Sequence, residues 1–82
     1  MKANSRIKVH FGKVIRQLRV ERGDSQYVVG YHCDLERAYI SRLERGISDP
    51  SLTTVFKISA YFGLTPGELT DRVHSLNKKG KK

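Results

Sequence analysis

Hydrophobic residues near the start of the chain recur at the spacing of one helix face: Ile7, Phe11, Val14, Ile15 and Leu18. Lysines and arginines occupy positions between them, so this segment predicts an amphipathic helix with a basic outer face. Gly23 is expected to end the helix, because glycine adopts the left-handed cap conformation without steric cost.

Two shorter helices are expected to follow, joined by a tight turn. Ser25 can accept hydrogen bonds from backbone N–H groups and so cap a helix over about residues 26–32. Asp34 is a turn residue, and the next helix is predicted over about residues 36–45, ending at Gly46. Two short helices separated by about three residues have the spacing of a helix-turn-helix, here spanning residues 25–46.

The C-terminal half predicts two further helices. The fourth follows Ser51 and ends at Gly63, and its residues on the helical period are Leu52, Val55, Phe56, Ser59 and Phe62. The run Thr65-Pro66-Gly67-Glu68 has the form of a capping box with proline at the first helical position. It opens a fifth helix, whose apolar residues are Leu69, Val73 and Leu76.

No segment alternates as a strand does, so the predicted fold is all-α, a compact five-helix bundle in a single domain over residues 1–76. Residues 77–82 contain no apolar residue and are expected to form a disordered basic tail. The tail is either a solubilising end or an arm that contacts phosphates. A chain of 82 residues buries only a modest core, which favours dimerisation.

Charge narrows the choice of partner. The chain has sixteen Lys plus Arg against eight Asp plus Glu, a net charge of +8, so its surface attracts polyanions, and nucleic acid is the first candidate. No apolar run reaches the ~20 residues of a membrane-spanning helix, and the N-terminus lacks the apolar stretch of a signal peptide. We therefore expect a cytoplasmic protein with no membrane partner.

The residues offer no support for enzymatic or metal chemistry. Cys33 is the single cysteine, and a small buried residue is favoured over a catalytic thiol, because the adjacent His32 does not face it on a helix. The histidines His10, His32 and His74 lack ligand-like spacing. No nucleophile paired with a base, no paired carboxylates and no phosphate-cradling glycine loop is found, so we expect no catalytic residue, metal or cofactor.

The residues on and around the helix-turn-helix are more specific than its spacing. They are Arg19, Gly23, Ser25-Gln26, Ile40-Ser41-Arg42-Leu43-Glu44-Arg45-Gly46, Pro50-Ser51-Leu52 and Gly63-Leu64. In this order and at these intervals they resemble the phage-repressor and Cro-like (XRE-like) family of bacterial helix-turn-helix regulators, over about residues 11–69. The resemblance implies the phage-repressor DNA-binding fold, with the third helix as the recognition helix.

The third helix then has an inner and an outer face. Ile40 and Leu43 point inward, which leaves an outer face of Arg37, Ala38, Ser41 and Arg42. The family's base-reading positions fall on Arg37, Ala38 and Arg42. Arginine suits guanine O6 and N7, and the alanine methyl suits a thymine methyl. The alternative is that these are ordinary solvated residues.

The resemblance also assigns supporting roles. Arg19 and Glu44 are expected to form a partly buried ion pair that clamps the first helix to the third, the alternative being two solvated charges. Phosphate contacts are expected from Ser25 and Gln26, at the positive end of the second helix, and from Arg45. Gln26 also braces a side chain of the recognition helix. Tyr39 either donates its hydroxyl to a phosphate or only packs against apolar neighbours.

Four positions depart from the family pattern: Asp24, Val28, Gly30 and Glu36. Gly30 stands where alanine is usual, a change expected to loosen the second helix by ~1 kcal/mol. Glu36 is a poor substitute for the common Ser, Thr or Asp cap. A carboxylate at this place must either accept from a cytosine N4 amine or be repelled by phosphate.

We therefore expect a sequence-specific transcriptional regulator that binds double-stranded DNA at a palindromic operator as a homodimer. It would act by occluding RNA polymerase or by contacting it, with no small-molecule ligand. Candidate dimer residues are Tyr61, Val73 and Leu76, which could instead be core. The run from Leu35 to Ser41 is similar to restriction-modification controller proteins, while small phage repressors and antitoxins fit nearly as well. A protein-interaction module and a non-specific DNA binder are the rival functions.

Overall fold

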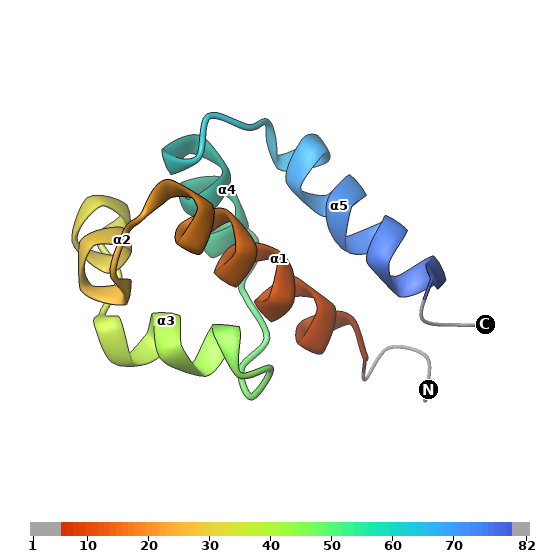
Figure 1. Ribbon diagram of the computed structural model, residues 1–82, viewed down its shortest axis with the longest axis horizontal. Coiled ribbons are helices and arrows are strands. Elements are labelled where there is room, and N and C mark those ends of the chain that lie inside the picture. The colour runs from red at the N-terminus through yellow and green to blue at the C-terminus, as the bar shows by residue number, and fades with distance from the viewer. Residues whose placement is uncertain (1–5, 80–82) are drawn as a thin grey trace.

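The computed structural model describes residues 6–79, and within that range the chain forms five helices and no strand. They are α1 (Ile7–Arg22), α2 (Gln26–Cys33), α3 (Arg37–Glu44), α4 (Leu52–Tyr61) and α5 (Pro66–Lys79). In Figure 1, α1 crosses the middle of the molecule, with α2 and α3 to one side and α5 to the other, and α1 packs against both α3 and α5. The prediction of an all-α, five-helix fold is confirmed.

Capping side chains set where three of the helices begin. The hydroxyl oxygens of Ser25 and Ser51 accept hydrogen bonds from the backbone N–H three residues later, at 3.1 and 3.0 Å. Thr65 and Glu68 form the predicted capping box, because each side chain accepts from the other's backbone N–H, at 3.0 and 2.8 Å. These bonds satisfy N–H groups that a helix start leaves without a partner inside the helix.

The hydrophobic core is shared by all five helices. Its buried residues are Phe11, Val14, Ile15, Val29, Cys33, Ile40, Leu43, Val55, Ile58, Leu69 and Val73. Of the apolar face predicted for α1, Phe11, Val14 and Ile15 are in this core, whereas Leu18 is only partly buried and Ile7 is 44% exposed, so that prediction is partly wrong. The inward positions predicted for α3, Ile40 and Leu43, are 1% and 0% exposed. The core therefore anchors one side of α3 and leaves its other side free.

The prediction for the apolar face of α4 is partly wrong. Leu52 and Phe56 were placed on the helical period, yet they are 72% and 54% exposed, whereas Ile58 is fully buried. Val55 and Ser59 of the predicted face are buried, but Thr54 and Ile58, which it did not include, are buried as well. The hydroxyl of Ser59 donates to the carbonyl of Phe56 at 3.1 Å, which satisfies it without a tertiary partner. Two large apolar side chains are thus left on the surface.

The fifth helix extends further than predicted. A tail was expected to begin at residue 77, but α5 continues through Asn77 and Lys78 to Lys79, so the predicted start of the tail is wrong by three residues. Leu76 packs against the core and holds the last described turns of the helix. The rest of the predicted tail, residues 80–82, lies outside the described residues. Over the described part of the chain, no helix is both long and apolar enough to cross a membrane.

Glycine occupies position 30 for a structural reason that helix propensity does not show. A Cβ added at Gly30 would lie 2.5 Å from the carbonyl oxygen of Leu35, and the Gly30 carbonyl accepts a bond from the Leu35 N–H at 2.8 Å. The chain reverses between these residues at Asp34, which has φ 58°. Glycine is therefore needed here despite the loosening of α2 expected from its helix propensity, because the tight turn into α3 leaves no room for a side chain.

Replacing Gly30 with alanine is expected to lower the free energy of unfolding by ~1–3 kcal/mol, the usual cost of overpacking, although alanine is the better helix former. Chemical denaturation measures the change. Gly67→Ala is the matched control, since a Cβ at Gly67 meets nothing closer than 3.8 Å. A Gly30→Ala variant as stable as Gly67→Ala, or more stable than wild type, would contradict the assignment.

Candidate nucleic-acid interface

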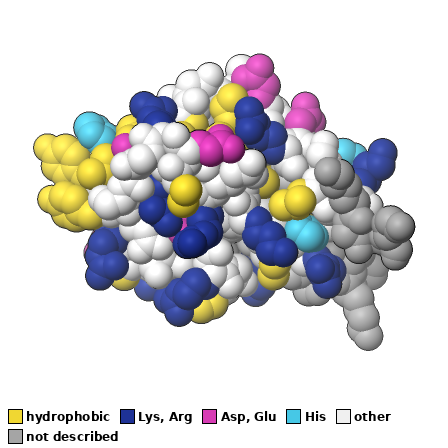
Figure 2. Space-filling view, viewed as in Figure 1, with side chains coloured by type: hydrophobic (Ala, Val, Ile, Leu, Met, Phe, Trp, Pro, Cys, Tyr) yellow, Lys and Arg dark blue, Asp and Glu magenta, His cyan; other side chains and the backbone are white. Residues whose placement is uncertain are grey.

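The outer face of α3 carries the residues expected to read bases. Arg37, Ala38 and Arg42 are exposed and Ser41 is half-buried, on the side of the helix opposite Ile40 and Leu43. Figure 2 shows Lys and Arg side chains gathered over the lower part of the molecule, where α3 lies in Figure 1, while most carboxylates in view lie nearer the upper edge. The structure thus brings three of the four proposed base-reading residues onto one open and basic side of the protein.

A buried carboxylate fixes the orientation of this helix. Glu44, near the end of α3, has a side chain only 3% exposed, and Arg19 of α1 donates to both of its oxygens, from Nη2 at 2.9 Å and from Nε at 2.5 Å. Arg19 also donates to the carbonyl of Asp24 at 3.0 Å. The hydrogen bond to Glu44 raises the pKa of Arg19, so the guanidinium stays charged. The ion pair implied by the resemblance is present in the structure and joins α1 to α3.

Gln26 at the start of α2 joins the same cluster. Its side-chain Nε2 donates to Oε1 of Glu44 at 3.0 Å, so it braces a side chain of α3. The exposed Ser25 uses its hydroxyl to cap α2. The first backbone N–H groups of α2 remain open at the positive end of the helix, where an anion is favoured.

Tyr39 and Arg45 flank the outer face differently. The half-buried ring of Tyr39 packs against the core, and its hydroxyl lies 3.2 Å from Oγ1 of Thr54, which joins α3 to α4. Arg45 is exposed, and its Nε donates to the Ser41 hydroxyl at 3.3 Å. Arg45 is therefore accessible to a phosphate. Tyr39 packs against apolar neighbours, which is the second of the two alternatives predicted for it.

The predicted dimer residues are largely engaged within the chain. Val73 is 7% exposed and belongs to the core, as the alternative for it described, and it also lines an apolar hollow between α1, α4 and α5. Leu76 is half-buried against the core. Tyr61 donates its hydroxyl to Asp24, which raises the pKa of Tyr61, and the Arg22 guanidinium lies 4.5 Å from its ring centroid. This contact also accounts for the acidic residue at position 24, where the family pattern is usually apolar.

Sequence reasoning missed the exposed apolar surface that the structure reveals. Leu52 and Phe56 project from α4, and Val55 of the same helix lines a hollow of about 290 Å³ together with mainly apolar residues of α1 and α5. The lining includes Ile7, Phe11, Val55 and Val73. The only signal in the sequence was the excess of large apolar residues in α4 over what one buried face can hold.

Cys33 and His10 are both buried, and burial shifts the pKa of each. Cys33 is buried, and burial raises the pKa of its thiol, the reverse of what a nucleophile requires. His10 is 3% exposed with no hydrogen-bond partner for either ring nitrogen, and burial, followed by the charges of Arg6 and Lys13, lowers its pKa. Within residues 6–79, no three His, Cys, Asp or Glu side chains lie close enough together to hold a metal ion.

Residues 15–69 match the helix-turn-helix family HTH_3. The matched segment contains α2 and α3 and includes both Arg19 and Glu44, the ion pair described above. The chain belongs to this helix-turn-helix family. Control protein C.BamHI of Bacillus amyloliquefaciens is 41% identical over 66 residues, covering 79% of this chain and 82% of the relative. Control protein C.MunI of Mycoplasma sp is 42% identical over 64 residues, covering 77% and 86%.

Solved structures agree with this helix-turn-helix assignment. The restriction-modification controller protein C.AhdI of Aeromonas hydrophila superimposes with a TM-score of 0.72 at 34% identity, covering 76% of this chain and 94% of that one. The clp gene regulator ClgR of Corynebacterium glutamicum gives a TM-score of 0.84 at 16% identity, covering 92% and 80%, which shows the shared fold. The helix-turn-helix protein is a DNA-binding transcriptional regulator, and its relatives are regulators rather than enzymes.

Proposed function

We propose that this regulator inserts α3 into the major groove of a palindromic operator, with Arg37, Ala38, Ser41 and Arg42 facing the base edges. The observation that carries the proposal is the two-sided character of α3. Its inner side is fully buried and tied to α1 through Glu44, while its outer side exposes two arginines and a methyl group. A helix held this rigidly presents its side chains in a fixed register, which base recognition requires.

Phosphate contacts would fix the position of α3 in the groove. The open N–H groups at the start of α2, beside Ser25 and Gln26, and the exposed Arg45 after α3 are the groups we assign to these contacts. Such contacts orient a protein on the duplex without reading its sequence. The Tyr39 hydroxyl holds α3 against α4 through Oγ1 of Thr54, and when Thr54 is the donor of that bond, the Tyr39 O–H is free to donate to a phosphate.

A second copy of the chain would complete the operator complex, because one α3 offers few base contacts and two half-sites a helical turn apart double them. The exposed Leu52 and Phe56, together with the apolar hollow that Ile7, Phe11 and Val55 line, form the surface we assign to that contact. Projecting apolar side chains and an apolar hollow suit a two-fold interface, in which each copy fills the other's hollow. In this assignment Val73 takes part as a lining residue of the hollow, and Tyr61 takes no part.

The biological subtype that the relatives favour is a restriction-modification controller protein. Two relatives that are 41% and 42% identical are named control proteins, and a solved structure at 34% identity is named a restriction-modification controller. Repression or activation would then follow from where the operator lies relative to the site of RNA polymerase. No ligand is needed for either.

Arg37→Ala and Arg42→Ala are each expected to weaken binding to the operator, once it has been selected from random duplex DNA with the wild-type protein, by ~1–3 kcal/mol. Each substitution removes a side chain suited to guanine. Binding to a scrambled duplex should change far less. Fluorescence anisotropy titrations on both duplexes measure the difference. Arg72→Ala on α5 removes the same charge from an exposed position on a helix that packs on α1 and α4, and serves as the control. Equal losses on both duplexes would show that the arginines contribute only charge.

A further inference from the structure

Glu36 occupies the N-cap position of α3 without acting as a cap. Its backbone has the extended conformation of a cap residue, φ −70° and ψ 144°, but its side chain makes no capping hydrogen bond. Ser25 and Ser51, at the same position of α2 and α4, do cap their helices. The family pattern favours a short polar cap at this site, so the long carboxylate is not explained by the start of the helix.

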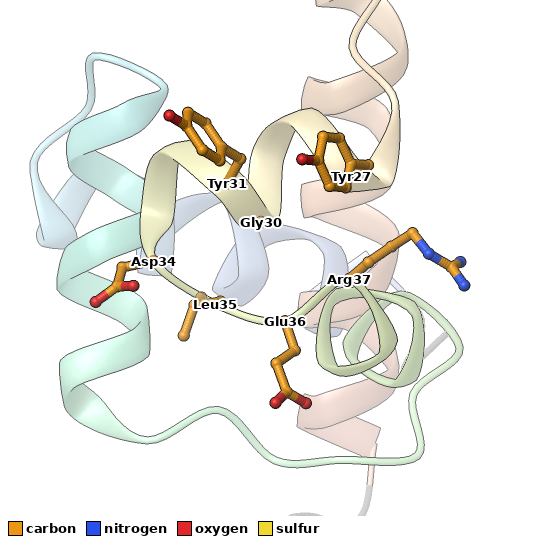
Figure 3. A pocket seen from close by; sticks show the side chains of 7 residues that line it. All are labelled: Tyr27, Gly30, Tyr31, Asp34, Leu35, Glu36 and Arg37. Carbon is orange, nitrogen blue, oxygen red and sulfur yellow. The ribbon is translucent and has the colours of Figure 1, made fainter.

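No other structural contact occupies the Glu36 carboxylate. It is exposed, and it takes part in none of the ion pairs or side-chain hydrogen bonds formed among residues 6–79. Figure 3 shows Glu36 and Arg37 leaving the start of α3 in different directions, Glu36 away from the tyrosines of α2 and Arg37 sideways, while Asp34 lies on the side toward α4. Glu36 is therefore a free acid at the leading end of the recognition helix, directly before its first proposed base-reading residue.

A carboxylate at this place has one favourable partner on DNA. The first residues of a recognition helix lie closest to the base edges. Phosphates repel a carboxylate, and guanine presents acceptors to it, whereas cytosine presents its N4 amine as a donor with no neighbouring acceptor of its own in the major groove. Adenine offers a donor as well, but its N7 acceptor lies beside it and opposes a carboxylate.

We propose that Glu36 is a specificity-determining residue that accepts a hydrogen bond from a cytosine N4 amine in the major groove. The inference rests on the proposed insertion of α3 into that groove. Because Glu36 and Arg37 diverge, they reach different base pairs. The net charge of +8 supplies attraction that is independent of sequence, so one carboxylate reduces binding at sites lacking the cytosine without preventing binding at sites that have it.

The test compares wild type, Glu36→Gln and Asp71→Asn on duplexes that carry each base pair in turn at every half-site position. Glu36→Gln keeps the size of the side chain and removes its charge, and glutamine suits adenine N6 and N7. Asp71 is an exposed acid on α5, which packs on α1 and α4, so Asp71→Asn is the control for charge alone. Thermal unfolding of each variant checks that the fold is kept.

Wild type should prefer cytosine at one half-site position by about tenfold or more, and Glu36→Gln should lose that preference or move it to adenine at that position alone. Asp71→Asn should keep the wild-type base preferences. If Glu36→Gln binds every duplex more tightly by a common factor, Glu36 only repels phosphate and the inference is overturned while the proposed function stands. If wild type prefers no base at any position, the proposed function itself fails.

Discussion

Replacing Glu44 with alanine is expected to lower the free energy of unfolding by ~3–5 kcal/mol, the cost of leaving one partner of a buried pair without the other. The Arg19 guanidinium is 13% exposed and would lose the carboxylate that receives its two hydrogen bonds, and the amide of Gln26 would lose its acceptor. For a domain of this size the melting temperature should fall by ~15 °C or more. Calorimetry or circular dichroism measures it.

Three further variants show whether the loss of stability belongs to the Arg19–Glu44 pair. Glu21 is an exposed carboxylate on α1 bonded only to Gln17, so Glu21→Ala should change stability by less than ~0.5 kcal/mol. Arg19→Ala should cost about as much as Glu44→Ala, and the double variant should cost clearly less than the sum, because the two residues act through one contact. A Glu44→Ala variant within ~1 kcal/mol of wild type would mean that the pair does not hold α1 to α3.

Gly12→Ala is expected to destabilise the fold by ~3 kcal/mol or more, at or above the usual cost of overpacking. A Cβ at Gly12 would lie 2.2 Å from the carbonyl oxygen of Leu43 and 2.7 Å from that of Glu44. Both are backbone atoms, which no rotamer change can move, so α1 and α3 would have to separate. Urea titration gives the change in free energy.

The same substitution elsewhere gives the comparison for Gly12. Gly67→Ala, in the first turn of α5, should be neutral or stabilising by up to ~1 kcal/mol, because a Cβ there is unhindered. Gly12→Ala should also weaken binding to the selected operator at temperatures where it is still folded, since the recognition helix would be displaced. Stability equal to that of wild type would show that α1 and α3 do not approach as closely as the structure has them.

The helices were predictable because their signals are local. Ser25, Thr65 and Glu68 act through backbone groups within three residues, so their capping bonds follow from spacing alone. The end of α1 at Gly23 is predictable for the same reason, since the left-handed conformation, here φ 79°, is intrinsic to glycine. The resemblance then supplied what spacing could not, the pairing of Arg19 with Glu44 across 25 positions of sequence.

The features that were not predictable depend on which helices meet. Glycine at position 30 has an intrinsic helix penalty, but its benefit arises only where the Leu35 carbonyl approaches. The exposure of Phe56 depends on α4 burying Thr54 and Ile58 instead, which helical periodicity could not decide among so many apolar residues. The burial of Val73 likewise depends on α5 packing against α1 and α4. Base-reading roles for the outer face of α3 stay predictions.

The tie between α1 and α3 links the fold to the proposed function. α3 is short, and a helix of this length gains little stability from its own backbone bonds. Its orientation is therefore set by Leu43 and Ile40 in the core and by Glu44 at its end. The outer face can carry exposed arginines because the opposite face supplies the stability.

The most direct test of the central claim is selection from random duplex DNA with the wild-type protein, followed by titration of the selected and a scrambled duplex at two salt concentrations. If α3 recognises the operator specifically, the selected site should be palindromic. It should bind the protein at least ~10³-fold more tightly than the scrambled duplex does, at both salt concentrations. Equal binding of both duplexes, fading together as salt is raised, would contradict specific recognition by α3 and leave only sequence-independent attraction to phosphates.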